Sequence, residues 1–519
     1  MVNKPAGWNT HAPSPFAGEG IYDWLKHREP RWAGLAIIHR LDKETSGVMV
    51  FGKTPRANRS LTEQFTRRSV RKSYLLLTDR AVPRVEFVVK SKLTRSGERY
   101  VSGARGELAE TRFGVSPSTG SGRLDRQKVE LQTVEATPLT GRTHQIRAHA
   151  AERGFPVLGD TLYGGSPFPR VCLHAAELTL RHPASGKEVT FRAPADFAVD
   201  RGHALRAAII EPKLTNSFRL VHGASDGWPD WYVDRLGDFL LSQSETPLGN
   251  GQRARLATFG GTAYHKVLSR HVRNSTRGET SPQLVLGPVA PERFVVRENG
   301  VQFELSFNAG YSVGLFLDQR DNRRQLLTGH VAAGFPLLTS DIRNLKSEIL
   351  NCFAYTCGFS VCAALAGART TSLDLSKKYL EWGRRNFALN GLDPAAHDFI
   401  YGDAFDWLRR LAKQGRAFDC VLLDPPTFSQ SKASGVFRAE KDFGKLVGAA
   451  LPVIKANGVL FASSNAAGWS ADDFLTAVGK AVQKAGRKIA RQHYVPQPPD
   501  FPISRAEPAY LKTMWLRIE

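Results

Sequence analysis

The chain has 519 residues, which is too long for one hydrophobic core and predicts about three domains. Its apolar (42%) and charged (23%) contents are those of globular proteins and exclude long disordered tracts. Lys and Arg outnumber Asp and Glu by 71 to 49, and the resulting net charge of +22 favours a polyanionic partner, with nucleic acid as the first candidate.

The five cysteines are few and odd in number, form no CxxC pair and have no histidine spacing typical of zinc. We therefore expect a reducing compartment and no metal site. The first residues lack the apolar core of a signal peptide, and no stretch approaches the ~18 apolar residues of a membrane span. These features predict a cytoplasmic protein without membrane association, and they leave its oligomeric state open.

The first motif in the chain is NKPAGW at residues 3–8. Its rigid Pro5 and permissive Gly7 stand beside a basic and an aromatic side chain, as a loop that approaches a ligand's backbone closely would need. By itself this motif indicates a loop and no particular chemistry.

The second motif is HRLDKETSG at residues 39–47. It follows an apolar run over 35–38 that predicts a buried strand, and it precedes a turn and a second strand over 48–51. Asp42 is thus expected on a loop between strands, where the flanking cations favour the ionised carboxylate. An ionised carboxylate can act as a nucleophile. For HRLD alone, a solvated ion pair on a surface loop is the alternative.

A basic run over 67–72 leads into a predicted strand over 74–77. The run indicates a phosphate-binding edge or, equally, a solvated helix end. The third motif, TGRTHQIRAH at 140–149, begins with a turn and enters a short helix that is expected to end at Gly154. Its His144 alone is most simply a residue at the start of a helix.

Together, and in this order, the three motifs resemble the signature of the RluA-type pseudouridine synthases, which have a mixed α+β fold. The resemblance implies conversion of uridine to pseudouridine in RNA without a cofactor. Asp42 would attack either ribose carbon 1′ or base carbon 6, Tyr74 would pack on the target base and take part in proton transfer, and Arg147 would pair with the aspartate and hold it ionised. In that family the first motif follows a strand, so we expect either that the strand is missing here or that the start codon is misassigned.

A connection punctuated by proline at 193–212 suits a domain boundary. The short β-rich runs after it, at 218–223, 231–235 and 238–242, are separated by Gly, Pro and Asp turns. This segment resembles the one that precedes the catalytic domain of RlmI-type rRNA methyltransferases. We expect either a small α/β hairpin domain that orients RNA or a plain spacer.

The last third alternates strand-like and helix-like stretches, as in a parallel α/β sheet. A strand over 347–351 feeds the loop 352–360, and a strand over 370–373 ends in Asp374, an acid placed to accept hydrogen bonds from a ribose. Ser376 is a predicted N-cap of a helix that stops at Asn390-Gly391. A fourth strand, 418–423, delivers the stretch DPPTF to its carboxyl end.

DPPTF resembles motif IV of class I methyltransferases that use S-adenosylmethionine, and the order of motifs over nearly all of residues 211–519 matches RlmI-type and RlmK-type enzymes. By this resemblance the cofactor would be bound by Phe353, Tyr355, Gly358, Asp374, Asp403 and Asp424. Asp374 would hold the ribose and Asp403 the adenine. Asp424 with Pro425 and Phe428 would frame the acceptor base, although Phe428 could instead pack under the edge of the sheet.

Methylation of cytosine at carbon 5 needs a covalent adduct, usually with a cysteine thiolate. RlmI-type enzymes carry that cysteine just after the fifth strand, where this chain has Ser463 and no cysteine follows Cys420. A serine without an adjacent base is a poor substitute. DPPTFSQSK resembles the RlmK-type enzymes, so we predict methylation of guanine nitrogen 7.

The sequence therefore predicts a multidomain α/β protein: a pseudouridine synthase domain over 1–205, a small α/β hairpin domain over 206–305 and a Rossmann-like methyltransferase sheet over 306–519. The expected function is a bifunctional enzyme that acts on 23S rRNA. One alternative is a methyltransferase for 5-methylcytosine or another rRNA base, with the first domain serving mainly to bind RNA. Another, a small-molecule methyltransferase with a basic accessory domain, fits the charge poorly.

Overall fold

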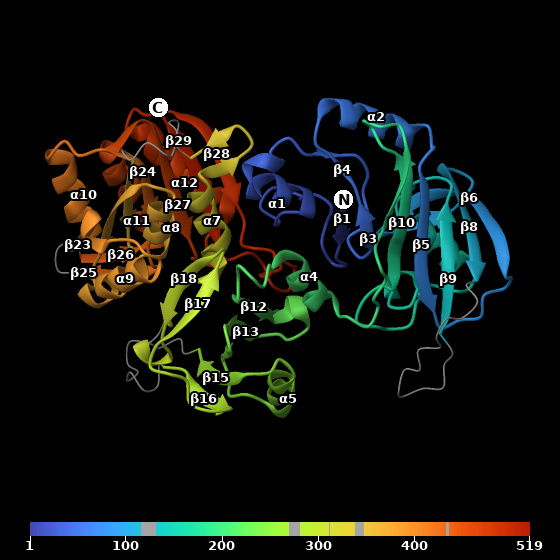
Figure 1. Ribbon diagram of the computed structural model, residues 1–519, viewed down its shortest axis with the longest axis horizontal. Coiled ribbons are helices and arrows are strands. Elements are labelled where there is room, and N and C mark those ends of the chain that lie inside the picture. Colours follow the sequence, from blue (N-terminus) through green and yellow to red (C-terminus); the bar gives the residue numbers. More distant parts are fainter. Residues whose placement is uncertain (116–130, 269–280, 311, 338–346, 432–434) are drawn as a thin grey trace. The chain divides into compact units, whose positions relative to one another are not determined.

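The computed structural model describes residues 1–115, 131–268, 281–310, 312–337, 347–431 and 435–519 (Figure 1). The chain forms two compact units. The first comprises Met1–Pro13, Glu19–Leu25 and Gly34–Ile209, and the second comprises Ser14–Gly18, Lys26–Ala33 and Ile210–Glu519. The finer division into three domains stays a prediction. Within the described ranges, no helix has the length and apolar character needed to cross a membrane.

The first unit is built on a nine-stranded sheet with the order β1-β3-β10-β5-β9-β8-β6-β7 and with β11 beside β10. Strands β3 and β10 run parallel, and the other neighbours in this sheet are antiparallel. Its strands are β1 (Val2–Lys4), β3 (Ser46–Met49), β5 (Arg71–Thr78), β6 (Glu86–Ser96), β7 (Arg99–Ser102), β8 (Glu107–Val115), β9 (Gln132–Pro138), β10 (Leu173–Arg181) and β11 (Glu188–Arg192). Strands β2 (Ala36–Ile37) and β4 (Phe51–Gly52) pair with each other outside it.

The helices in this part of the chain are α1 (Ile21–Arg28), α2 (Pro55–Thr66), α3 (Gln145–Glu152) and α4 (Arg201–Ile209). Helix α3 packs on β7, β8 and β9, and its Ile146 and Ala150 join a core with Leu76, Phe113 and Val134. The predicted strand over 74–77 lies within β5. The predicted end of α3 is also found, since Gly154 follows it with φ = 82°.

The strand expected over 35–38 is shorter than predicted, because only Ala36 and Ile37 form a ladder. They pair with β4 in a two-stranded ribbon outside the main sheet and are half-buried rather than buried. Asp42 nevertheless lies where it was expected, on the connection between β2 and β3.

The second unit contains a five-stranded sheet of order β12-β13-β14-β15-β16 and a seven-stranded sheet of order β23-β22-β21-β24-β27-β29-β28. The strands before the larger sheet are β12 (Ser217–His222), β13 (Trp231–Leu236), β14 (Phe239–Ser244), β15 (Thr262–Val267), β16 (Gln283–Leu286), β17 (Phe294–Glu298), β18 (Val301–Leu305), β19 (His330–Ala332) and β20 (Phe335–Pro336). The later ones are β21 (Glu348–Cys352), β22 (Arg369–Asp374), β23 (Asp398–Tyr401), β24 (Phe418–Leu423), β25 (Phe428–Ser431), β26 (Gly435–Arg438), β27 (Ile454–Ser464), β28 (Ile489–Val495) and β29 (Lys512–Ile518).

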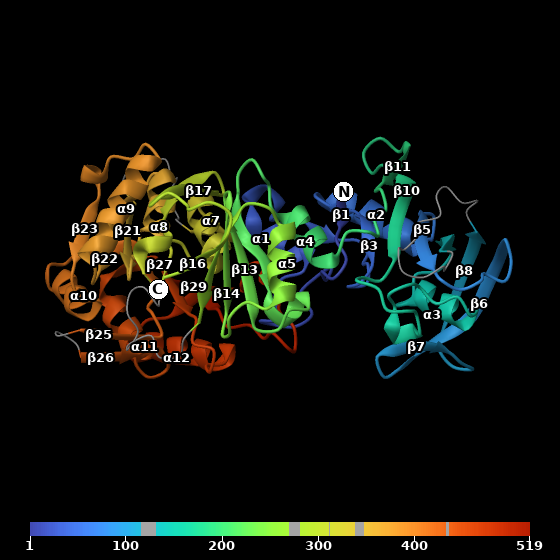
Figure 2. The same ribbon diagram turned by 90° about the horizontal axis from the view of Figure 1, so that it is seen from below.

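Helices cover both faces of the larger sheet. They are α7 (Arg320–Thr328), α8 (Gly358–Leu365), α9 (Lys377–Leu389), α10 (Ala404–Lys413), α11 (Ala439–Ala450) and α12 (Ala471–Lys484). Helix α5 (Asn250–Thr258) packs on the smaller sheet instead. Figure 2 shows α8 and α9 on one side of the strands and α11 and α12 on the other. A hydrophobic core lies on each face of this sheet, and neighbouring residues of β21 belong to different cores. Ile349 belongs to the core with Phe359 and Phe387, and Leu350 to the core with Leu446 and Phe474. Strands that bury side chains on both sides are typical of a parallel sheet covered on both faces.

Strands β21, β22, β23, β24 and β27 are parallel, and β29 joins β27 antiparallel. The chain proceeds from β21 outward through β22 and β23 on one side and then returns to β24 on the other. Open α/β sheets bind ligands at the carboxyl ends of the strands beside such a switch point. In this sheet, that edge holds the loop after β21, Asp374 at the end of β22, and Asp424 directly after β24.

Candidate active sites

The first unit contains a cleft of about 1070 Å³ that brings the three predicted catalytic residues together. Asp42, Tyr74 and Arg147 all line it, although they come from three motifs that are far apart in the sequence. Asp42 and Tyr74 are half-buried, and Arg147 is buried. Asp42 is the one carboxylate among the described residues that line this cleft.

The wall of the cleft is strongly basic. Seven cationic side chains line it, namely Arg40, Arg68, Arg71, Lys72, Arg112, Arg142 and Arg147. Three of them, Arg68, Arg71 and Lys72, belong to the basic run over 67–72, which overlaps the start of β5. A concave surface lined with one sign of charge concentrates the field and attracts a polyanion. Of the two interpretations of that run, the position of these side chains favours the phosphate-binding edge.

The first motif of the chain holds the backbone of the Asp42 loop through hydrogen bonds. Lys4 is fully buried, and its ammonium donates hydrogen bonds to the carbonyls of Pro5 (2.9 Å), Trp8 (2.7 Å) and Lys43 (3.0 Å). The Gly7 amide donates to the Lys43 carbonyl at 2.8 Å. NKPAGW thus fixes the loop that carries Asp42, and sequence analysis missed this role because lysine is ordinarily exposed.

Thr10 holds the other side of the same loop. Its hydroxyl donates to the Leu41 carbonyl at 2.9 Å and accepts from the Leu41 amide at 3.2 Å. The Thr45 amide donates to the Asp42 carbonyl at 3.1 Å and closes the turn. The position of the Asp42 backbone is therefore set from both sides, as a reacting group requires.

Tyr74 and His39 supply aromatic surface in the cleft. Burial, and to a smaller extent the charge of Asp42, raises the pKa of Tyr74 above its ordinary value, so its phenol stays protonated. Burial lowers the pKa of His39 to about 4, and nearby Lys72 acts in the same direction. The neutral ring of His39 stacks on Phe65 at 4.8 Å and accepts a hydrogen bond from the Val50 amide at 3.1 Å.

The predicted pair between Arg147 and Asp42 is wrong for this structure, because Arg147 pairs with Asp160. Its Nε and Nη2 donate to the two carboxylate oxygens at 2.6 and 2.7 Å, and both side chains are almost inaccessible, at 5% and 1% exposure. The turn before Asp160 depends on Gly159, where φ is 82° and a Cβ atom would lie 1.9 Å from the Arg170 carbonyl oxygen.

The ring of Tyr163 lies 5.0 Å from the guanidinium of Arg147 and supports it from one side. The Tyr163 hydroxyl is bonded to the Nδ1 atom of His144 at 3.0 Å and accepts from the Tyr100 amide at 2.7 Å. His144 is the N-cap of α3 and has a left-handed backbone. It is therefore a residue at a helix start, as the sequence suggested, and it contributes a bond to this support.

In the second unit, the loop after β21 winds through three non-glycine residues with positive φ: Phe353 (61°), Tyr355 (49°) and Cys357 (63°). This winding directs the Tyr355 amide to Asp374, whose two carboxylate oxygens accept from the amides of Tyr355 and Ser376 at 2.8 Å each. Burial raises the pKa of Asp374, although these backbone bonds act in the opposite direction. A carboxylate oxygen has further lone pairs, so Asp374 can still accept from a diol.

Asp403 lies in a second cleft of about 420 Å³, together with Phe353, Leu375, Phe405 and Phe437. As the N-cap of α10 it accepts from the Asp406 amide at 3.1 Å, and it also accepts from the Ser431 hydroxyl at 2.7 Å. Asp403 and Asp442 are the two carboxylates in the described lining. An aromatic pocket with a carboxylate acceptor suits a planar base that bears an amino group.

The second cleft collects only part of the predicted cofactor set. Phe353 and Asp403 line it, and Leu375 brings its wall next to Asp374. The remaining predicted residues do not line this cleft; they are Tyr355, Gly358, Asp374, Asp424, Pro425 and Phe428. Pro425 is buried, and Phe428 is half-buried at the start of β25, where it pairs with Arg438.

Asp424 is part of a polar cluster that sequence analysis did not foresee. The Nε2 atom of Gln319 donates to Asp424 at 3.2 Å and to Ser463 at 2.8 Å. Gln319 thus links the Ser463 hydroxyl to the Asp424 carboxylate. Burial raises the pKa of Asp424 to about 6, against the opposing effect of the neighbouring Ser463 and Gln319 side chains.

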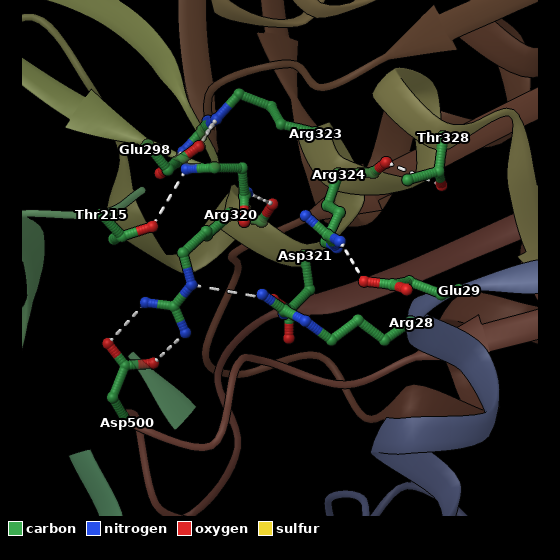
Figure 3. Close-up of polar contacts among 11 residues, drawn as sticks. Arg28, Glu29, Thr215, Glu298, Arg320, Asp321, Arg323, Arg324, Thr328 and Asp500 are labelled. Carbon is green, nitrogen blue, oxygen red and sulfur yellow. Dashed lines mark hydrogen bonds and ion pairs between the residues drawn. The ribbon is translucent and has the colours of Figure 1, made fainter. Parts of the chain in front are cut away.

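Residues Asp318 to Arg324, around the start of α7, each reach a different part of the second unit. Figure 3 shows the contacts of Arg320, Asp321, Arg323 and Arg324. Arg320 pairs with Asp500 at 2.6 and 2.8 Å, and Arg323 pairs with Glu298 at 2.6 and 2.8 Å. The other bonds join Asp318 to Tyr510 (2.9 Å), Asp321 to Arg28 (3.7 Å), Asn322 to Trp515 (3.2 Å) and Arg324 to Glu29 (2.7 Å). This anchoring fixes the backbone that presents Gln319.

All five cysteines of the chain are buried and unpaired. Burial raises the pKa of Cys352, Cys357 and Cys362 to about 12 and that of Cys420 further. A thiol with such a pKa is not ionised near neutral pH and is a poor nucleophile.

Two family comparisons cover most of the chain. Residues 1–152 match the family of RNA pseudouridylate synthases, and residues 257–517 match the family of S-adenosylmethionine-dependent methyltransferases. The expectation of a pseudouridine synthase region followed by a methyltransferase region is thus confirmed, as is the mixed α/β class of the fold.

Named relatives align with the second match. The chain is 33% identical over 337 residues to a ribosomal RNA large subunit methyltransferase from Deinococcus radiodurans, across 62% of this chain and 78% of that protein. It is 32% identical over 323 residues to ribosomal RNA large subunit methyltransferase I from Klebsiella pneumoniae (strain 342), across 60% of this chain and 76% of that protein. Among solved structures, the methyltransferase SMU.776 in complex with SAH is similar, with a TM-score of 0.51, 27% identity and coverage of 65% of this chain and 86% of that one.

Proposed function

Because the chain belongs to the S-adenosylmethionine-dependent methyltransferase family and carries an RNA pseudouridylate synthase domain ahead of it, we propose that it modifies large-subunit ribosomal RNA in two ways. It isomerises a uridine to pseudouridine in the cleft of the first unit, and it methylates guanine nitrogen 7 at the carboxyl edge of the larger sheet. Such a substrate would place the protein in the cytoplasm.

The observation that carries the first activity is Asp42, the one carboxylate in the described lining of a cleft with seven cations. Counterion release from phosphates would supply the affinity, and unstacking of the target base, which costs a few kcal/mol, would be offset by aromatic contacts such as Tyr74.

The isomerisation needs no cofactor. An Asp42 oxygen forms a bond to ribose carbon 1′ or to base carbon 6, and the bond between carbon 1′ and nitrogen 1 breaks. The base turns, carbon 5 bonds to carbon 1′, the proton on carbon 5 leaves and nitrogen 1 gains one. The Asp42 bond is released at the end, so the product is an isomer of the substrate. The protonated phenol of Tyr74 lies in the same cleft and packs on the base.

For the second activity, S-adenosylmethionine would supply the methyl group. The residues fit this cofactor, since Asp374 retains acceptor capacity for ribose hydroxyls and the 420 Å³ cleft offers Asp403 between aromatic side chains for the adenine. Tyr355 contributes its backbone amide, which orients Asp374.

The burial of the cysteine thiols and of the Ser463 hydroxyl supports a nitrogen atom as the methyl acceptor. Guanine nitrogen 7 has a lone pair and needs no covalent adduct, whereas carbon 5 of cytosine needs a thiolate. None of the five cysteines is exposed. Ser463 is 0% exposed and its hydroxyl is hydrogen-bonded to Gln319, which leaves it unsuited to attack a base.

Both parts of the proposal can be tested on unmodified large-subunit rRNA transcribed in vitro. Filter binding at several salt concentrations should show affinity that falls steeply with salt. After incubation with methyl-labelled cofactor, nucleoside analysis should recover the label in 7-methylguanosine and detect new pseudouridine. Label in 5-methylcytidine would overturn the assigned acceptor, and salt-independent binding would overturn the RNA-binding role of the cleft.

A further inference from the structure

Gln319 occupies a position in the second unit that its immediate sequence does not explain. It lies just before α7, is 3% exposed, and its Nε2 atom bridges Ser463 at 2.8 Å and Asp424 at 3.2 Å. Its Oε1 atom accepts from the Asn322 side chain at 2.8 Å, and Asn322 is in turn bonded to Trp515. The orientation of the amide, with Nε2 toward the carboxylate, is therefore determined by its own hydrogen bonds.

The three side chains differ in accessibility. Ser463 (0% exposed) and Gln319 (3%) are closed off, whereas Asp424 is half-buried. Asp424 is the member of the cluster that a bound base can approach. The buried Gln319 amide donates to the carboxylate and is itself held by the buried Ser463 hydroxyl. Such a support fixes the rotamer of the carboxylate and favours its ionised state.

If the methyl acceptor is a ring nitrogen, such a carboxylate can stabilise the positive charge that develops on the base. When the ring nitrogen of guanine takes the methyl group with its lone pair, no proton is released and the base becomes a cation. The positive charge moves from the sulfur of the cofactor to the base during the step. A fixed negative charge beside the base stabilises the transition state more than the ground state, which is the condition for catalysis.

We propose that Gln319 is a positioning residue for methyl transfer, which together with Ser463 holds the Asp424 carboxylate ionised beside the base that becomes positively charged. This inference rests on the proposed nitrogen acceptor. It assigns a role in the reaction, carried out through Asp424, to residues 314–324, with the sequence GLFLDQRDNRR. It also gives a reason for the dense anchoring of residues 318–324.

The test compares Gln319→Met with Gln325→Met. Both glutamines lie on or next to α7 and are buried, but Gln325 donates to the Val331 carbonyl, away from Asp424. Methyl transfer to unmodified large-subunit rRNA is measured from pH 5 to 8 with the full-length protein. Loss of one hydrogen bond to a charged group should lower the maximal rate by about 10- to 100-fold in Gln319→Met. It should also move the acidic limb of the profile upward by about one pH unit, with KM for the cofactor little changed.

Gln325→Met should keep both the rate and the limb of the parent. Gln319→Glu, of nearly equal volume, places a second carboxylate against Asp424 and should lose more activity than Gln319→Met. An unmoved acidic limb in Gln319→Met, or a Gln319→Glu enzyme as active as the parent, would overturn the inference. Nucleoside analysis of the parent reaction distinguishes the two proposals. If the label is in 7-methylguanosine but the Gln319 variants keep the rate and pH profile of the parent, only the role of Gln319 is refuted. If the label is in 5-methylcytidine, the proposed guanine acceptor is refuted.

Discussion

Breaking the pair between Arg147 and Asp160 should destabilise the first unit strongly. Asp160→Asn keeps the shape of the side chain but removes its charge, and the Arg147 guanidinium then remains buried without a carboxylate. With the two side chains only 5% and 1% exposed, water cannot replace the lost partner. Removal of one member of a buried pair costs about 3–5 kcal/mol. Pseudouridine formation should also fall, because Arg147 lines the cleft beside Asp42.

The control is Glu177→Gln, which breaks the pair between Glu177 and Arg192 in the same sheet. These side chains are 41% and 70% exposed, and such a pair is worth about 0–1 kcal/mol. Because a chain of two units need not unfold in one step, hydrogen exchange should be followed separately for amides of β5 and β9 and for those of β21 and β24. Exchange should accelerate only in the first pair of strands. An effect of Asp160→Asn no larger than that of Glu177→Gln would refute the reasoning.

Three further outcomes are expected. Methyl transfer should rise as pH increases through about 6, where Asp424 ionises, and a rate that is level between pH 5 and 7 would contradict its role. The pKa of His39 is about 4 in the folded protein and near 6.5 in the unfolded chain. Its contribution to stability is therefore complete above pH 6.5 and declines as pH falls toward 4, by up to about 3 kcal/mol. His39→Gln should flatten the resulting dependence of the melting temperature on pH, and an unchanged slope would count against this expectation. Calorimetry with S-adenosylmethionine should detect one site in the parent and much weaker binding after Asp374→Ala. The control variant Asp393→Ala, which changes an exposed helix cap, should bind the cofactor as the parent does. Equal affinity of the two variants would rule out Asp374 as a ligand.

Features that depend on local pattern were predictable from the sequence. The strand β24 follows an apolar run, β21 does so in part, and β22 is rich in β-branched Thr. Asp374 ends β22 and Asp424 follows β24, so their common edge was expected. The helix after Ser376 begins and ends as its caps predict, with the Ser376 hydroxyl accepting from the Tyr379 amide at 3.2 Å. These results need only hydrophobic periodicity and cap chemistry.

Partnerships across the chain were not predictable, because they depend on tertiary placement. Arg147 pairs with Asp160, 13 residues away, beyond a turn at Gly159 that packs against the Arg170 carbonyl. Lys4 is buried against the carbonyl of Lys43, 39 residues away, although lysine is rarely buried. Gln319 contacts Asp424 across 105 residues and Ser463 across 144, and no local signal in the sequence announces either contact.

The most direct test of the central claim is the effect of Asp42→Asn on both activities of the full-length protein. Unmodified large-subunit rRNA is incubated with the variant and with the parent, and pseudouridine and methylated nucleosides are quantified by mass spectrometry in the same digest. We predict that Asp42→Asn forms no pseudouridine and transfers methyl groups at the rate of the parent. Pseudouridine formation within tenfold of the parent's rate would contradict the assignment of Asp42 as the nucleophile.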